Sequence, residues 1–273
     1  MFVKIYIIVE GIFMKLVLLL ILAVLPVVLF IFYINSKDKQ KEPKGLLAAL
    51  FFSGFLACFL VVLISYIMSS IFPIFDLEVK SLDFLQLAIY VFIGVALVEE
   101  LCKWLFTMLI GFRSKNFDET FDIIVYSTFV SLGFACIENV LYVVQGGFLS
   151  ALLRAITSVP GHMCFGIIMG YYLLLAKLSK KNNNKKLYKK NIALSLVIPI
   201  LAHGIYDYFL FLGNIFFLFV LLVLIILFFV YSHSKLKQVA SVNRKIFYKN
   251  KYCPRCGVLV ETPYCPHCGL KHE

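Results

Sequence analysis

Charged side chains are scarce in this sequence, since Asp, Glu, Lys and Arg make up 15% of its 273 residues whereas 62% are hydrophobic. The mean hydropathy is +0.95, and several uncharged runs are long enough to span a membrane. So few charges do not cover the surface of an ordinary water-soluble domain. The shortage of charge therefore excludes that class and places the chain among integral membrane proteins.

Acidic residues are scarcer still, with 15 Asp and Glu against 26 Lys and Arg and a formal net charge of +11. Many of the basic side chains lie in short loops between apolar runs, where Lys and Arg mark the cytoplasmic side of a membrane. We interpret this charge as a topology signal that faces anionic lipid headgroups. A nucleic-acid partner is a poor second interpretation.

The first apolar run, residues 16–34, has no small-residue cleavage site after it. It is too long for the core of a signal peptide and leads into a basic loop, so we expect it to be retained as a membrane anchor. Met14, just ahead of the run, is an alternative start to Met1.

Seven apolar runs reach the roughly 20 residues that a transmembrane helix needs. They lie at about residues 16–34, 46–72, 84–111, 121–144, 150–177, 191–211 and 214–232. The sequence therefore predicts an all-α polytopic membrane protein with about seven transmembrane helices.

The loops between these runs alternate in charge. The first, third and fifth loops are basic, whereas the second carries Asp76, Glu78 and Asp83 around Lys80 and the fourth, QGGFLS, has no charge. Because Lys and Arg accumulate on the cytoplasmic side, we expect a cell-membrane protein with its amino terminus outside and its carboxyl terminus in the cytoplasm.

The tail reads YCPRCGVLVETPYCPHCG and contains two Cys-Pro-x-Cys-Gly turns. Two such turns point four thiolates at one metal ion, so they predict a structural zinc site of Cys253, Cys256, Cys265 and Cys268. Disulfides are the alternative, but a reducing cytoplasmic location argues against them. A filled Cys₄ site does not activate water, so we expect this module to bind a cytosolic protein partner or to cap the tail.

These features divide the chain into four parts. We expect an anchor helix with its basic loop, a membrane core, a basic linker and a small zinc ribbon, at 1–44, 45–232, 233–251 and 252–273.

Ionisable side chains interrupt the apolar runs at mid-bilayer depth. Facing lipid, five of them would together cost roughly 12–17 kcal/mol, which rivals the stability of a whole domain. They are Glu99, Glu100, Lys103, Glu138 and Asp207. We therefore expect them to face one another or a wet cavity, together with His162 and His203. Arg154, near a helix end, is expected to reach the lipid headgroups instead.

Helical spacing supports a shared site, because residues four apart lie on one face. Glu99 and Lys103 are so placed, as are His203 and Asp207. Interhelical salt bridges are the purely structural interpretation. Crowded carboxylates and imidazoles also suit general acid and base chemistry, either with a divalent ion held by the two histidines and a carboxylate or without a metal.

Four motifs in this order resemble the PrsW family of intramembrane proteases, relatives of the CAAX prenyl endopeptidases. They are E-E-x-x-K at 99–103, G-F-x-x-x-E-N-x-x-Y at 133–142, a histidine at His162 and H-G-x-x-D at 203–207. The resemblance covers roughly residues 45–232. It implies that Glu99 or Glu100 activates a water molecule, that Glu138, His162 and His203 complete the centre, and that the substrates are membrane-tethered regulators such as anti-sigma factors.

Two other classes of protein fit part of the pattern. A proton-coupled transporter or channel also places acids and histidines in the membrane, but transporters commonly contain paired repeats and this sequence shows none. A non-catalytic membrane scaffold that recruits partners through the zinc ribbon is the second alternative.

Overall fold

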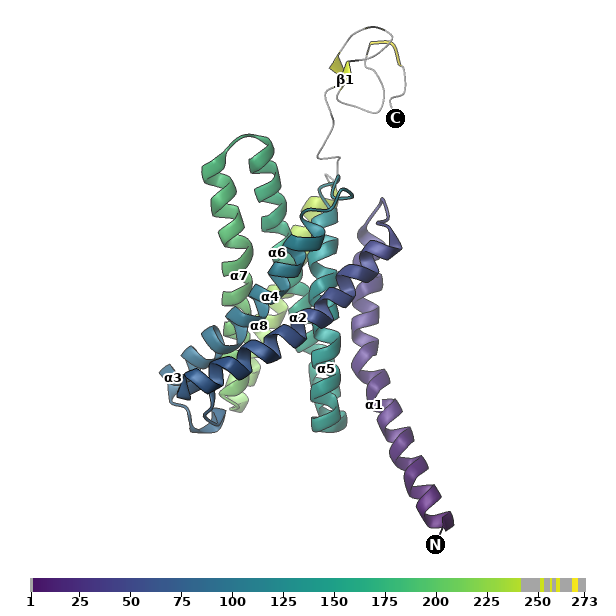
Figure 1. The fold of residues 1–273 in the computed structure, drawn as a ribbon, viewed down its shortest axis with the longest axis vertical. Coiled ribbons are helices and arrows are strands. Elements are labelled where there is room, and N and C mark those ends of the chain that lie inside the picture. The colour runs from purple at the N-terminus through teal and green to yellow at the C-terminus, as the bar shows by residue number, and fades with distance from the viewer. Residues whose placement is uncertain (1, 242–250, 253–255, 257–258, 261–266, 270–273) are drawn as a thin grey trace.

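The computed structural model describes residues 2–241, 251–252, 256, 259–260 and 267–269 (Figure 1). Its long helices are α1 (Phe2–Lys37), α2 (Lys44–Ile71), α5 (Asp122–Ile156), α6 (Ser158–Lys181), α7 (Lys185–Phe211) and α8 (Ile215–Ser241). The shorter elements are η1 (Pro73–Phe75), η2 (Val79–Ser81), α3 (Phe84–Ile89), η3 (Tyr90–Leu97), α4 (Val98–Phe106), η4 (Thr107–Gly111), β1 (Lys251–Tyr252) and β2 (Leu259–Val260).

The prediction of an all-α polytopic membrane protein is confirmed. Within the described residues, six helical segments are long and apolar enough to cross a membrane. The number differs from the predicted seven because the runs predicted at 121–144 and 150–177 belong to one segment of 60 residues, Asp122–Lys181. A straight helix of that length would measure about 90 Å, three times the thickness of the hydrocarbon core, so the segment must fold back.

The reversal occurs at Gly147, whose φ of 68° and ψ of −155° are not helical. A residue with a Cβ is strained at such a positive φ. The two arms then run antiparallel, since Ser127 Oγ donates to the Gly166 carbonyl at 2.8 Å and Ser131 Oγ to the His162 carbonyl at 2.9 Å. Both pairs are centred on the reversal, which lies in the predicted fourth loop.

This hairpin of α5 and α6 forms the centre of the molecule. Of an 18-residue apolar stretch in this segment, 83% is buried inside the protein. The corresponding stretches of the other five segments are only 17–39% buried. Small residues allow the two arms to approach closely, because a Cβ at Gly170 would lie 2.7 Å from the Ile124 Cα. Close packing through small side chains is how helices associate in lipid.

Helix α2 crosses α5 with equally little space between the backbones. A Cβ at Gly133 would overlap the Phe51 carbonyl oxygen, and one at Gly54 would overlap the Val130 carbonyl oxygen. These two glycines therefore set the distance between α2 and α5.

Gly133→Ala is expected to destabilise the protein by several kcal/mol, because overpacking against backbone cannot be relieved by a side-chain rotation. Unfolding of the purified protein in mixed detergent micelles measures this. Gly45→Ala is the matched control, since no atom lies within 4 Å of its added Cβ. Equal stability of the two variants would contradict the close crossing.

The third membrane segment consists of α3, η3, α4 and η4, and its η3 and η4 parts are π-helical. π-Helical turns are uncommon and are frequent at functional sites. The Phe92 ring lies over Gly204 of α7, and the Phe75 ring lies over Gly94, so a Cβ at either glycine would clash. These contacts fix the segment against α7 and η1 on either side.

The connections between helices lie at two ends of the bundle (Figure 1). Those joining α1 to α2, η4 to α5 and α6 to α7 lie at the upper end, and those joining α2 to α3 and the two arms of the hairpin lie at the lower end. The three predicted basic loops thus share one end of the molecule.

The carboxyl-terminal tail contains the antiparallel pair of β1 and β2, in which Tyr252 lies opposite Leu259. Cys253 and Cys265 lie outside the described residues. The zinc ribbon therefore stays a prediction.

Candidate active site in the membrane

The seven side chains predicted to share a site come together at the middle of the bundle. Helix α4 contributes Glu99, Glu100 and Lys103, α5 contributes Glu138, α6 contributes His162, and α7 contributes His203 and Asp207. Six of them are buried, and Glu138 keeps 16% of its side chain exposed. The expected cost of facing lipid is thus avoided by mutual contact.

Lys103 is the fully buried cation at the centre of this group. Its Nζ lies 2.8 Å from Glu100 Oε1, 3.2 Å from Glu99 Oε2 and 3.1 Å from His162 Nδ1. It also lies 4.1 Å from the centre of the Phe134 ring. The expected Glu99–Lys103 ion pair is present, but it is one contact within a larger network rather than an isolated salt bridge.

His162 connects this network to a second carboxylate. Its Nε2 lies 2.8 Å from Glu138 Oε2. An ammonium has no acceptor, so Lys103 must donate to His162 Nδ1, and Nε2 must carry the proton donated to Glu138. The contacts therefore assign one tautomer of His162.

His203 lies on the opposite side of the site. Its Nδ1 is 3.0 Å from Glu100 Oε1, and its Nε2 is 3.4 Å from Asp207 Oδ2 and 3.9 Å from Glu99 Oε2. Carboxylate oxygens thus face both ring nitrogens, which suits an imidazole that donates from both. The predicted pairing with Asp207 is present, but the shorter contact is with Glu100.

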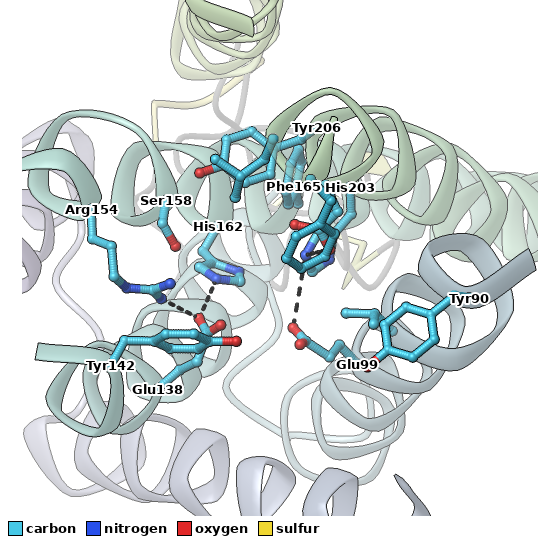
Figure 2. Close-up of a pocket in the computed structure, with 14 residues that line it drawn as sticks. Tyr90, Glu99, Glu138, Tyr142, Arg154, Ser158, His162, Phe165, His203 and Tyr206 are labelled. Atoms are coloured by element: carbon cyan, nitrogen blue, oxygen red, sulfur yellow. Dashed lines mark hydrogen bonds and ion pairs between the residues drawn. The ribbon is translucent and has the colours of Figure 1, made fainter. Parts of the chain in front are cut away.

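A cavity of about 130 Å³ opens between these groups, as Figure 2 shows. It has room for about four water molecules at about 30 Å³ each. Glu99, Glu138, His162, His203 and Asp207 line it. Glu100 and Lys103 do not line it and lie behind the cavity wall, so the two adjacent glutamates occupy different environments.

Arg154 was predicted to reach the lipid headgroups, and that prediction is wrong. Its Nη2 lies 2.8 Å from Glu138 Oε2, its Nε donates to Asn139 Oδ1 at 2.8 Å, and its guanidinium lies 4.3 Å from the centre of the Tyr142 ring. The reversal at Gly147 brings the start of the returning arm back beside the end of α5. The signal in the sequence is the nearly equal spacing of the two residues from the Gly-Gly pair, since Glu138 lies eight residues before Gly146 and Arg154 lies seven residues after Gly147.

Other lining residues were not singled out by the sequence, because aromatic and hydroxyl side chains are common in apolar helices. They include Tyr90, Ser158, Phe165 and Tyr206, whereas Tyr142, which also lines the cavity, is the last residue of the motif at 133–142 (Figure 2). Tyr206 donates to Thr157 Oγ1 at 3.1 Å, which joins α7 to the junction between α5 and α6.

The predicted divalent ion, held by His162, His203 and a carboxylate, stays a prediction. Over the described part of the chain, no three His, Cys, Asp or Glu side chains are grouped so as to hold a metal. Lys103 Nζ already lies where Glu99, Glu100 and His162 converge. A metal at that point would have to displace the ammonium, because like charges repel at such distances.

Comparisons with known proteins agree with these features. A family described as PrsW family intramembrane metalloprotease matches residues 42–232. The chain is 39% identical to Protease PrsW of Oceanobacillus iheyensis, over 67% of this chain and 78% of that protein. It is 33% identical to Protease PrsW of Clostridioides difficile, over 85% and 95% respectively. No solved structure matches the chain.

Proposed function

Because the chain belongs to the PrsW family of intramembrane proteases, we propose that Glu99 is the base that activates water for hydrolysis of a peptide bond within the membrane. The family excludes the transporter and the scaffold as the principal function. One observation carries the choice of base, since Glu99 lines the cavity and its neighbour Glu100 does not.

In the proposed reaction, Glu99 takes a proton from a water molecule in the cavity, and the resulting hydroxide attacks the scissile carbonyl carbon. The carbonyl π-electrons move to oxygen and form a tetrahedral intermediate. Collapse of the intermediate breaks the C–N bond, and the Glu99 carboxylic acid returns its proton to the leaving amine. General-base catalysis of this kind contributes about 10²–10⁴ in rate.

His203 is proposed to stabilise the oxyanion through Nε2, the ring nitrogen on the side of Glu99 and Asp207. Glu100 accepts from Nδ1 at 3.0 Å and thereby orients the ring. A donor held in place before the reaction stabilises developing charge without a cost of reorganisation. Glu100 is a positioning residue in this scheme, and Lys103 is the cation that both glutamates contact.

His162 and Glu138 form the opposite wall of the cavity. They are proposed to bind the substrate backbone on the leaving-group side, with His162 held in one tautomer by Lys103 and Glu138. Substrates are proposed to be membrane-tethered proteins, with anti-sigma-factor-like regulators as candidates.

Arg154→Gln is expected to lower kcat/KM by roughly 10- to 100-fold, because one hydrogen bond to a charged group contributes ~1.5–3 kcal/mol. Arg154→Lys should recover part of the rate, since it retains the charge but not the two-pronged contact with Glu138 and Asn139. The pH profile of kcat/KM should also change, because Glu138 loses its cation. Lys115→Gln, an exposed charge change, is the control. An unchanged profile and rate in Arg154→Gln would place Arg154 outside the working site.

Co-expression with candidate single-span membrane proteins tests the proteolytic function. Fragments should appear with the wild-type chain and be absent with Glu99→Gln at equal membrane abundance. Fragments that persist with Glu99→Gln would assign cleavage to another protease or another base.

The orientation is proposed from the clustering of the basic loops at one end of the bundle, which we assign to the cytoplasm together with the carboxyl terminus. Single cysteines are placed at Lys185 and Lys80 in a background without reactive thiols, and they should differ in their labelling in intact cells. An impermeant reagent should label the position at Lys80 only. Labelling at Lys185 would reverse the topology.

The tail is proposed to hold one structural zinc ion through the four cysteines named above, and to offer a surface to a cytosolic protein. Metal content of the full chain, compared with a truncation ending before Tyr252, tests this proposal. Zinc that is lost with the tail supports the ribbon, and stoichiometric metal in the truncated chain would instead point to the membrane site.

A further inference from the structure

The geometry points to a second binding site, for an anionic phospholipid, at the end of the bundle where the basic loops gather. A cavity of about 580 Å³ lies between the end of η4, the end of α6 and the start of α7. Arg113, Lys177, Lys180 and Lys181 line it together with the aromatic rings of Phe112 and Tyr188. No acidic side chain is among the described residues that line it.

A second cavity of about 470 Å³ adjoins the first. It shares Lys180 and Tyr188 with the first cavity and adds Lys185 and Lys189. Together the two cavities gather six cations from α6, α7 and the connection that follows η4, and they share the aromatic side chain of Tyr188. Such a concentration of like charge in a concave surface raises the local concentration of anions.

Part of this site is held in a fixed geometry. Lys177 Nζ donates to the Phe112 carbonyl at 3.4 Å and lies 4.4 Å from the centre of the Phe117 ring. It thereby joins α6 to the connection that follows η4. Arg113 and Lys180 are exposed, and within the described structure neither forms an ion pair. Their charges remain available for a phosphate.

The position of the cavities selects a lipid as the ligand. They lie at the last turns of two membrane segments and the first turn of a third, which is the depth of the headgroups. Basic pockets between transmembrane helices on the cytoplasmic side bind phosphate-bearing headgroups. Two adjoining basic cavities suit a lipid with two phosphodiesters, so the preferred ligand is cardiolipin rather than phosphatidylglycerol.

Such a lipid would contact, at one end of the bundle, the three membrane segments that carry catalytic side chains. The third segment carries Glu99, α6 carries His162 and α7 carries His203, and all three contribute to the lipid site. The lipid site does not depend on the proposed chemistry and is tested by binding alone.

The experiment measures lipid binding to the delipidated full chain in a neutral detergent by native mass spectrometry. Cardiolipin should bind saturably, one per chain, and more tightly than phosphatidylglycerol or phosphatidylcholine. Arg113→Gln with Lys180→Gln should weaken binding by roughly 30-fold, as expected for the loss of two cations near a headgroup. The matched control, Lys39→Gln with Lys44→Gln, removes two exposed lysines from the first loop and the start of α2 and should change binding by less than about threefold.

Several results would overturn the proposal. Equal losses in the two double variants would show a diffuse surface charge rather than a site. Displacement of cardiolipin by an equimolar amount of inorganic pyrophosphate would identify a soluble phosphate as the ligand. Equal affinity for phosphatidylglycerol would overturn the preference for two phosphates. Thermal unfolding without lipid checks that both double variants are folded.

Discussion

Glu99→Gln is expected to lower the rate of substrate cleavage by at least about 100-fold and to leave the stability of the folded protein near that of wild type. The amide cannot accept a proton from water, and a general base contributes about 10²–10⁴ in rate. Stability is retained because Lys103 keeps its closer partner, Glu100, at 2.8 Å. Cleavage of a reconstituted single-span substrate and unfolding in detergent measure the two quantities separately.

Glu100→Gln is the informative companion, because the two glutamates are adjacent in sequence and differ in environment. It should lower both activity and stability, since Glu100 contacts Lys103 and His203 from a fully buried position. Glu78→Gln, an exposed change of the same type, is the control. The assignment of Glu99 as the base fails if Glu100→Gln abolishes cleavage and Glu99→Gln retains it.

Combined substitutions add a second criterion. When residues act as one catalytic unit, substituting them together lowers the activity little more than substituting one of them. Glu99→Gln with His203→Ala should therefore be nearly as active as Glu99→Gln alone. Losses that multiply would indicate separate structural contributions.

Lys103→Met is expected to destabilise the protein by about 3–5 kcal/mol, because removing one partner of a buried ion pair leaves the other charge uncompensated. Here two glutamates, Glu99 and Glu100, would lose their shared cation in a buried site. Unfolding by increasing the fraction of denaturing detergent measures the free-energy difference.

A second substitution separates the electrostatic effect from loss of packing. Adding Glu100→Gln to Lys103→Met should restore part of the lost stability, because the unpaired charge is removed as well. Lys80→Met, in the exposed second loop, is the control and should be nearly neutral. A Lys103→Met protein as stable as wild type would show that Lys103 is not the central cation.

The membrane segments and the contacts within one helix could be predicted from the sequence, because both depend on residues that are close together along the chain. The length of the apolar runs gave the membrane segments, since the bilayer fixes how many residues a helix needs to cross it. A spacing of four residues predicted that Glu99 contacts Lys103 and that His203 contacts Asp207. The structure has these pairs at 3.2 Å and 3.4 Å. Both follow from 3.6 residues per turn.

Contacts between helices were not readable in this way. The spacing within α4 does not show that Lys103 reaches His162, 59 residues further along, or that Glu100 rather than Asp207 makes the shorter contact with His203. These pairs depend on how closely the helices approach and on their rotation about their axes. The close crossings at Gly54 and Gly133 and the π-helical turns of the third segment determine both.

The sequence by itself determined that this protein lies in a membrane and that its acids and histidines are too costly to leave in lipid. Only the tertiary structure decided which of two neighbouring glutamates lines the cavity and that Arg154 joins the site instead of the headgroups. The physical reason is that hydrophobicity and helical period act along the chain. The depth of Arg154 depends on the reversal at Gly147, and the exposure of Glu99 depends on the neighbouring helices that pack around it.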